Sequence, residues 1–455
     1  MNRRRRPCPK HSKSGKLGSA GTICIFTPCA RLQGERGRGI ITAMNSTTPN
    51  ADAPANNLPR RLESLDALRG FDMLMIMGLA PLVTALCVLF GWGGDCALAQ
   101  QFRHVEWNGL RFEDTIFPLF LFLAGVSWPF SCAAQRERGA STRAIVLRCL
   151  KRAVLIFLLG LLFEGRLRIG SVLGRIGIAW MIGAMLHVFF RPRTLAVLAF
   201  VLPLAYWLAM YFFPAPDAAA LVVPKSLEFV KDFGTGPFSI VGNLSGWVDR
   251  HFMPGVLSPY TGIADNQSAL GFIPAASTAL LGILSGEFLR SSRSMPPTRR
   301  IGLMLLAAAV LAALGLAVAN CFGHMSMPIN KKLWSASFVF VVGGYSVAML
   351  AVFHLLVDVM GLSRWAFFFK VIGMNSITIY LAQRFIQFKV VAGNILGEAP
   401  RAAANAAGAV HLTGGRGLAG LLSPAAGEVL LAAGYIAVCW LFLFFLYRRK
   451  IFLKV

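Results

Sequence analysis

The sequence predicts an all-α membrane protein, a polytopic bundle of about ten transmembrane helices. Of its 455 residues, 56% are hydrophobic and only 14% are charged, whereas a soluble domain carries about 25% charged residues. Apolar runs of about 20 residues recur, the length that crosses a hydrocarbon core of ~30 Å. We expect spans at 72–92, 115–134, 145–163, 174–190, 194–213, 271–289, 300–322, 333–358, 366–388 and 427–447. An eleventh span is left open, because 389–426 contains weakly apolar stretches.

The net charge of +25 has the distribution of a membrane protein and does not indicate a nucleic-acid partner. Residues 1–43 hold ten Lys/Arg and one Glu, and the remaining cations lie mainly in short loops. The basic segments 135–152, 290–300 and 448–454 fall on one side of a ten-span bundle, as the positive-inside rule requires. We therefore expect a bacterial inner-membrane protein with both termini cytoplasmic and the bilayer as its solvent.

The chain divides into a polar N-terminal segment and a membrane domain. Residues 1–58 are rich in Arg, Ser, Pro and Asn and are expected to be disordered. Because Met44 precedes a second polar lead, we hypothesise that the protein starts there and that 1–43 lie upstream of the true start. Residues 59–455 form the membrane domain, with a long outer loop at 214–270.

The nine cysteines show no C-x-x-C pair and no zinc-like Cys/His spacing, so no metal site is expected. Most of them fall within predicted spans, where a small apolar residue is the plain interpretation. Cys96 and Cys321 both fall toward the outer face, and a disulfide between them is left open.

The segment from His104 to Ser127 carries the densest polar and aromatic motif, at the outer start of the second span. His104 is of the one residue type that exchanges protons near neutral pH without perturbation. Asp114 falls where a helix begins, which stabilises negative charge, and a nearby carboxylate fixes an imidazole tautomer. The alternative is an interfacial histidine beside a helix-capping aspartate.

The pattern His104-x-x-Trp107-Asn108-Gly109-Leu-x-x-x-Asp114, followed by x-x-Phe-Pro-x-Phe-x-Phe-x-x-Gly-x-Ser, resembles the signature of the heparan-alpha-glucosaminide N-acetyltransferase family. Those proteins are multi-spanning acyltransferases that move acetyl from acetyl-CoA to the amine of a terminal glucosamine. The resemblance implies that His104 is the active-site residue and Asp114 the acid of the motif. It also implies acetyl-CoA as a co-substrate and no tightly bound cofactor.

Further matches to the family run from about Leu62 to Gln387. They are Ser64–Gly70, Val172–Ala179, Asn243–Arg250, Ala275–Gly282, Pro328–Ser335 and Gly373–Tyr380. Two departures stand out: Gly174 replaces the usual Gln, and Asp265-Asn266-Gln267-Ser268 replaces an acidic Asp-Pro-Glu-Gly lead-in. The second departure leaves the identity of the acceptor open.

The resemblance and the cost of burying unpaired polar groups together predict one polar cavity, holding an amino sugar or glycan end. The residues expected to bind it are Trp107, Asn108, Asn243, Asp249, Asn330, Lys331 and Asn375. Asn375 falls inside a span, where polar residues are functional candidates. We expect it within ~15 Å of His104, the scale of a sugar-sized ligand in a typical pocket.

The anionic phosphates of acetyl-CoA need cations on the cytoplasmic side. The candidates are Arg69, Arg148, Lys151 and Arg152, although the positive-inside rule alone also explains them. His104, near the periplasmic face, acts either as general base or as a transient acetyl carrier. An amino-sugar transporter, and an acyltransferase of the same fold with another acceptor, remain alternatives, and a homodimer is left open.

Overall fold

The computed structural model describes residues 62–260, 262–397 and 418–453. All of them lie in the second of two compact units, which runs from Asn57 to Val455. The expected disorder of 1–58 and the hypothesis about Met44 therefore fall outside the described residues. The described part is all-α apart from one short antiparallel pair, β1 (Pro259–Tyr260) with β2 (Ala264–Asp265).

The long helices match the expected spans to within a few residues at most ends. They are α1 (Glu63–Leu74) continued by η1 (Met75–Leu79) and α2 (Ala80–Leu89), α4 (Phe112–Glu137), α5 (Thr142–Glu164), α6 (Val172–Phe189), α7 (Pro192–Phe212), α9 (Phe272–Ser291), α10 (Pro297–Asn320), α11 (Ala336–Phe353) continued by η4 (His354–Val359), and α15 (Pro424–Arg448). The first span starts well before the expected residue 72, because α1 and α2 join through η1 into one helix.

The shorter elements connect these helices or cap the bundle. They are α3 (Ala97–Gln101), η2 (Lys225–Phe233), α8 (Leu244–Phe252), η3 (Gly323–Met325), α12 (Ser363–Gly373), α13 (Ser376–Phe385), α14 (Phe388–Leu396) and η5 (Leu418–Leu421). The expected span at 366–388 is broken, since α12 and α13 meet at an angle of 52°.

Eight helices of the described part are long and apolar enough to cross a membrane, or nine if the bent pair α12–α13 counts as one span. The tenth expected span is α5. It forms a helix of 23 residues, but Arg148, Lys151 and Arg152 interrupt the apolar run in its first half. The chain is thus a polytopic helical membrane protein, with α5 the least apolar of its long helices.

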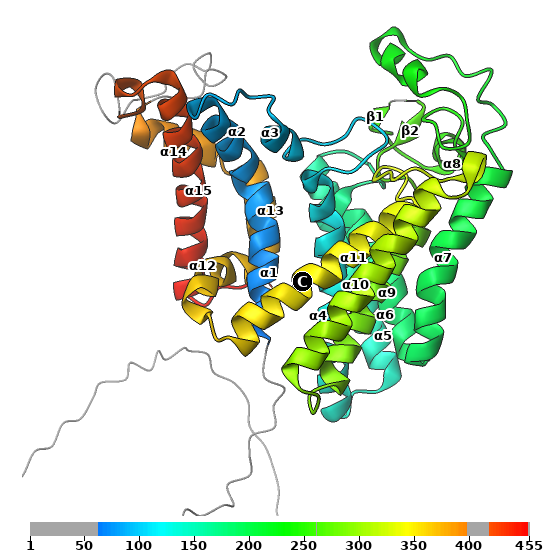
Figure 1. The fold of residues 1–455 in the computed structure, drawn as a ribbon, viewed down its shortest axis with the longest axis horizontal. Helices are drawn as coiled ribbons and strands as arrows, with labels where there is room; N and C mark the ends of the chain where they lie inside the picture. The colour runs from blue at the N-terminus through cyan, green and yellow to red at the C-terminus, as the bar shows by residue number, and fades with distance from the viewer. Residues whose placement is uncertain (1–61, 261, 398–417, 454–455) are drawn as a thin grey trace, which may run out of the picture. The chain divides into compact units, whose positions relative to one another are not determined.

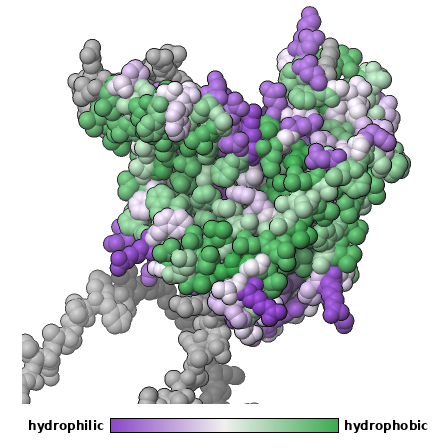
Figure 2. All heavy atoms as spheres, in the orientation of Figure 1, coloured by the Kyte–Doolittle hydropathy of each residue, from purple (hydrophilic) through white to green (hydrophobic). Residues whose placement is uncertain are grey.

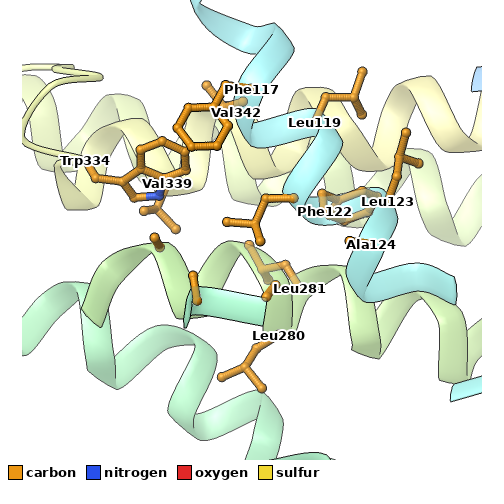
Figure 3. Packing of buried hydrophobic residues seen from close by; sticks show 14 of the residues in the cluster. Phe117, Leu119, Phe122, Leu123, Ala124, Leu280, Leu281, Trp334, Val339 and Val342 are labelled. Carbon is orange, nitrogen blue, oxygen red and sulfur yellow. The ribbon is translucent and has the colours of Figure 1, made fainter. Parts of the chain in front are cut away.

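Helices α4 to α11 form one group, and small residues set its closest contacts. A Cβ atom on Gly125 of α4 would lie 2.4 Å from the carbonyl oxygen of Ala279, and one on Gly282 of α9 only 2.1 Å from that of Phe122. The run Ala275–Gly282 therefore has the packing role expected of it. Figure 3 shows the core beside this contact, where Phe117 and Trp334 pack edge to face with ring centroids 5.0 Å apart.

A second group comprises α2 and α12 to α15, with α1 lying between the two groups (Figure 1). Its separate core includes Met73, Met77, Ile372 and Leu443. Gly70 of α1 lies so close to α12 that a Cβ would meet the Phe369 carbonyl oxygen. Apolar side chains cover the flanks of both groups, and polar residues gather at the two ends (Figure 2), as expected of helices that cross a bilayer.

The outer loop 214–270 is folded and is held to the bundle by a buried ion pair. Arg168, between α5 and α6, donates from Nε and Nη2 to the two carboxylate oxygens of Asp265 at 3.0 and 2.9 Å. It also donates to Glu164 at 2.9 Å and to the Ser258 carbonyl at 2.9 Å. Bidentate geometry of this kind fixes orientation as well as adding energy, so it fixes the loop over the bundle.

Candidate active site

His104 and Asp114 are in contact, as the motif requires. His104 lies in the segment between α3 and α4, and its Nδ1 atom is 2.9 Å from Oδ1 of Asp114 in the first turn of α4. The Asp114 Oδ2 atom accepts the backbone N–H groups of Arg111 at 3.2 Å and Val105 at 3.4 Å. The carboxylate thus closes a capping box on α4 and orients the imidazole with its other oxygen.

The two partners differ sharply in exposure, which assigns their roles. The Asp114 side chain is 1% exposed and that of His104 is 58% exposed. A buried carboxylate that accepts a proton-bearing Nδ1 leaves the Nε2 lone pair of the neutral ring outward.

Lys331 completes a three-residue cluster from the far side of the sequence. Its Nζ atom lies 3.3 Å from His104 Nδ1 and 3.3 Å from Asp114 Oδ1, and its side chain is 15% exposed. Burial lowers the pKa of Lys331, and the Asp114 charge opposes that shift. The ammonium balances the charge of the buried carboxylate.

Asn108 and Asn330 lock the motif to the loop before α11. The Asn330 amide donates to Asn108 Oδ1 at 3.0 Å, and its own Oδ1 accepts from the Leu333 backbone at 2.9 Å. The Gly109 backbone N–H donates to the Ile329 carbonyl at 2.8 Å. These bonds hold Lys331 over His104 and engage the oxygen of the exposed Asn108 side chain.

Beside the His104 cluster, the Lys332 ammonium packs against two aromatic side chains, Trp107 and Tyr260. Trp107 is buried and donates from Nε1 to the Phe238 carbonyl at 2.9 Å. Lys332 donates to the Tyr260 hydroxyl at 2.6 Å and to the Glu106 carbonyl, and it lies 5.2 Å from the Tyr260 ring centroid. Burial lowers the pKa of Lys332 to about 8. Lys332 and Tyr260 escaped the sequence analysis, since no local pattern links them.

Asn243 and Asp249 lie in the outer loop, and their polar atoms are engaged there. Asn243 caps α8, with Oδ1 accepting from Gly246 at 2.6 Å and its amide donating to the Ser239 and Ile240 carbonyls. Asp249 is buried and accepts the backbone N–H groups of Ala269 at 2.9 Å and Asp265 at 3.3 Å. Burial raises the pKa of Asp249 to about 7. Neither residue contacts His104.

Asn375 has its hydrogen-bonding partners elsewhere. It lies at the break between α12 and α13, where its amide donates to the Ile451 carbonyl just beyond α15 at 3.1 Å. Its Oδ1 accepts from Thr378 at 3.4 Å. The buried amide does find the partner that its position demands, but that partner belongs to the second helix group and not to the His104 cluster.

The four candidate cations lie deeper along the bundle than His104. Arg69 donates to the Leu123 carbonyl at 3.4 Å, and Leu123 is nine residues, about 14 Å, beyond Asp114 along α4. Arg152 stacks over Trp180 with its guanidinium carbon 4.3 Å from the ring centroid. Arg148 donates to Gln135 near the far end of α4 at 2.7 Å, and Lys151 is exposed.

No group of three or more His, Cys, Asp or Glu side chains in residues 62–260, 262–397 and 418–453 could hold a metal ion. Cys96 and Cys321 are both free thiols. The polar side chains gathered at His104 are its own imidazole, the Asp114 carboxylate, the ammonium groups of Lys331 and Lys332, and the Asn108 amide.

No family model matches this chain. It is 26% identical to human (Homo sapiens) heparan-alpha-glucosaminide N-acetyltransferase over 378 residues, covering 72% of this chain and 54% of that protein. The chain is a distant homologue of these acetyltransferases. The mouse (Mus musculus) protein of the same name is also 26% identical, over 375 residues, with the same coverage. The chain spans about half the length of the curated relatives it matches.

Asp265, in the segment that departs from the family's acidic lead-in, is buried and bonded to Arg168 through both carboxylate oxygens. It therefore belongs to the contact that holds the outer loop to the bundle.

Proposed function

We propose that this chain is a membrane-embedded acyltransferase that moves acetyl from acetyl-CoA to the amine of a glucosamine-type sugar. The observation that carries the proposal is the contact of an exposed His104 with a buried Asp114, in a distant homologue of acetyltransferases. Acyl transfer needs an accessible imidazole that accepts a proton or an acyl group. It also needs a negative charge beside that imidazole, here the Asp114 carboxylate, to stabilise the cation that forms.

The chemistry requires a proton to leave the amine before it attacks. With His104 as general base, Nε2 takes this proton, the amine nitrogen attacks the thioester carbonyl, and the C–S bond breaks. The CoA thiolate then accepts the proton. With His104 as carrier, Nε2 itself attacks and holds the acetyl until the amine displaces it. Asp114 stabilises the imidazolium in both routes.

The oxyanion of the tetrahedral intermediate needs a neutral donor. Of the donors considered, Trp107 already donates to Phe238 and Asn375 to Ile451. The Asn108 amide accepts from Asn330 through its oxygen only, and its NH₂ group remains for the oxyanion or for a sugar hydroxyl. We assign this role to Asn108.

Acetyl-CoA is the co-substrate in this proposal, with Arg69, Arg148, Lys151 and Arg152 holding its phosphates. Because Arg69 bonds Leu123 partway along α4 and Arg148 bonds Gln135 near its far end, the thioester has to reach into the bundle to meet His104. We propose a bacterial inner membrane, with the basic loops cytoplasmic and His104 near the periplasmic face.

Substitution of His104 by Ala tests the function. Purified protein is incubated with labelled acetyl-CoA and a panel of amino sugars, glucosamine among them. We expect acetylated product with the wild type and a loss of about 10²–10⁴-fold with His104→Ala. The matched control is His251→Ala, since His251 is exposed on α8 outside the cluster. Near-wild-type turnover of His104→Ala, or sugar uptake into proteoliposomes without acetylation, would overturn the proposal.

Sidedness is tested separately by accessibility labelling. Single cysteines are introduced at Arg138, in the basic loop after α4, and at Arg401, which lies outside the described residues. The proposed topology predicts that an impermeant reagent labels the two from opposite sides. Labelling of both from the same side rules it out.

A further inference from the structure

A cavity of about 210 Å³ lies at the end of the bundle opposite His104. It is formed by the last turns of α4, α6 and α9, and no part of the proposed function uses it. Cys132 follows Asp114 by 18 residues on α4, a rise of about 27 Å. The lining residues are Pro129, Cys132, Ala133, Arg136, Glu137, His187, Glu287 and Arg290.

His187 and Glu287 form the polar core of this cavity. The His187 Nε2 atom lies 2.8 Å from Glu287 Oε1, and their side chains are 8% and 15% exposed. Arg290 donates to the other Glu287 oxygen at 3.0 Å and holds the carboxylate in place. The remaining ring nitrogen, Nδ1 of His187, is buried and has no hydrogen-bond partner. An unpartnered buried nitrogen is costly and needs a reason.

The Cys132 thiol lies in the same cavity as this nitrogen. Its side chain is buried on α4. Close packing of α4 against α9, where a Cβ on Gly286 would lie 2.4 Å from the Val126 carbonyl oxygen, brings Glu287 to the same end of α4. A thiol beside an imidazole whose other nitrogen bonds a carboxylate is the arrangement of a nucleophile, its base and an orienting group.

We propose that Cys132, His187 and Glu287 form a second acyl-transfer site, which accepts the acyl group of a thioester. The choice of acetyl-CoA as that thioester rests on the proposed function. His187 Nδ1 takes the thiol proton, and the Cys132 thiolate attacks the thioester carbonyl. The C–S bond to CoA breaks, and the imidazolium returns its proton to the CoA thiolate. One thioester replaces another, so the acetyl group on Cys132 stays transferable.

The surroundings of the cavity suit an anionic thioester. Arg136 is exposed and Arg290 is 43% exposed, and both stand at the edge of the cavity. Arg148 is bonded to Gln135 of the same α4 end. These cations can hold CoA phosphates outside while the acyl end enters, and the 8% exposed His187 and buried Cys132 sit within.

Isotope exchange tests this site without any amine acceptor. Full-length protein is incubated with unlabelled acetyl-CoA and labelled CoA, and labelled acetyl-CoA is measured. A covalent acyl-Cys132 predicts exchange in the wild type, and its abolition in Cys132→Ala. The control is Cys439→Ala, because Cys439 is equally buried but lies in the second helix group. His187→Asn keeps the thiol and should slow exchange by about 10²–10⁴-fold.

His104→Ala separates this site from the first one. We expect exchange to survive in His104→Ala while sugar acetylation is lost, and acetyl to be found on the Cys132 peptide by mass spectrometry. Exchange that depends on His104 and persists in Cys132→Ala would overturn the inference and support His104 as the carrier. Absence of exchange in a wild type that still acetylates sugars would overturn it too, leaving the proposed function intact. If the proposed function itself is wrong, the wild type forms no acetylated sugar.

Discussion

The Nζ atom of Lys331 lies 3.3 Å from the Nδ1 atom of His104, although 227 residues separate them in the chain. The same ammonium is 3.3 Å from Asp114 Oδ1. One cation thus balances the buried carboxylate and sits beside the imidazole that the carboxylate orients. The arrangement joins the loop before α11 to the segment between α3 and α4, and it fixes the position of the imidazole that we propose to be reactive.

Asp114→Asn should preserve the fold and lose most of the activity. The Asn oxygen can still accept the Arg111 backbone N–H, but the NH₂ group then faces His104 Nδ1 and favours the tautomer with a proton on Nε2. We expect a loss of about 10²–10⁴-fold in kcat, by analogy with the aspartate of a hydrolase triad. Steady-state kinetics with labelled acetyl-CoA measure it, and an unchanged helical circular-dichroism spectrum shows that the variant is folded, even though loss of the Asp114–Lys331 pair lowers its melting temperature. Wild-type kcat in this variant would remove Asp114 from the mechanism.

Asn108 and Asn330 should be energetically coupled. A double-mutant cycle with Asn108→Ala and Asn330→Ala is expected to give a coupling of about 0.5–1.5 kcal/mol in the free energy of unfolding. Asn330→Ala should be the more damaging single change, because Asn330 is fully buried and also caps Leu333. Denaturant unfolding in detergent provides the measurement. Strictly additive effects would mean that the 3.0 Å bond between the two amides contributes nothing.

Asp265→Asn should destabilise the outer loop. The substitution removes one of the two carboxylates that pair with the buried Arg168 and leaves only Glu164. Removing one partner of a buried ion pair lowers the free energy of unfolding by about 3–5 kcal/mol. The expected result is a lower melting temperature and faster proteolysis within 214–270. Asp95→Asn is the matched control, since the Asp95–Arg103 pair is 82% and 49% exposed and such pairs contribute about 0–1 kcal/mol. Equal effects of the two substitutions would contradict the structural role of Asp265.

Lys332 should give the protein a stability that rises with pH above neutrality. Burial lowers its pKa from 10.5 to about 8 in the folded state, so between those values the unfolded chain binds more protons than the folded one. Stability therefore increases over that window. Tyr260, whose pKa burial raises to about 12, keeps its proton throughout. Melting temperatures from pH 7.5 to 10.5, on the order of this window, should rise for the wild type relative to Lys332→Met. Parallel curves for the two proteins would show that Lys332 does not titrate there.

The amino-acid sequence by itself determined the fold class and most of the helix positions. Each is a local property, because an apolar run long enough to cross a bilayer must satisfy its own backbone as a helix. The sequence also placed His104 and Asp114 in one motif, but the structure decided that their side chains touch. Even the charges in α5, which make it less apolar than its neighbours, were visible in the sequence.

Only the tertiary structure decided which distant residues meet. Lys331, Lys332 and Tyr260 reach the His104 motif because α4, α9 and α11 pack closely through small residues. The structure also pairs the Asn375 amide with the Ile451 carbonyl beyond α15, a partner that no local pattern indicates. Cys132, His187 and Glu287 lie near the last turns of α4, α6 and α9. These helices end side by side, so the three residues line one cavity at the end of the bundle opposite His104. Hydropathy specifies that a helix crosses the membrane, but not how it is rotated or which helices it contacts, and those contacts assemble both sites.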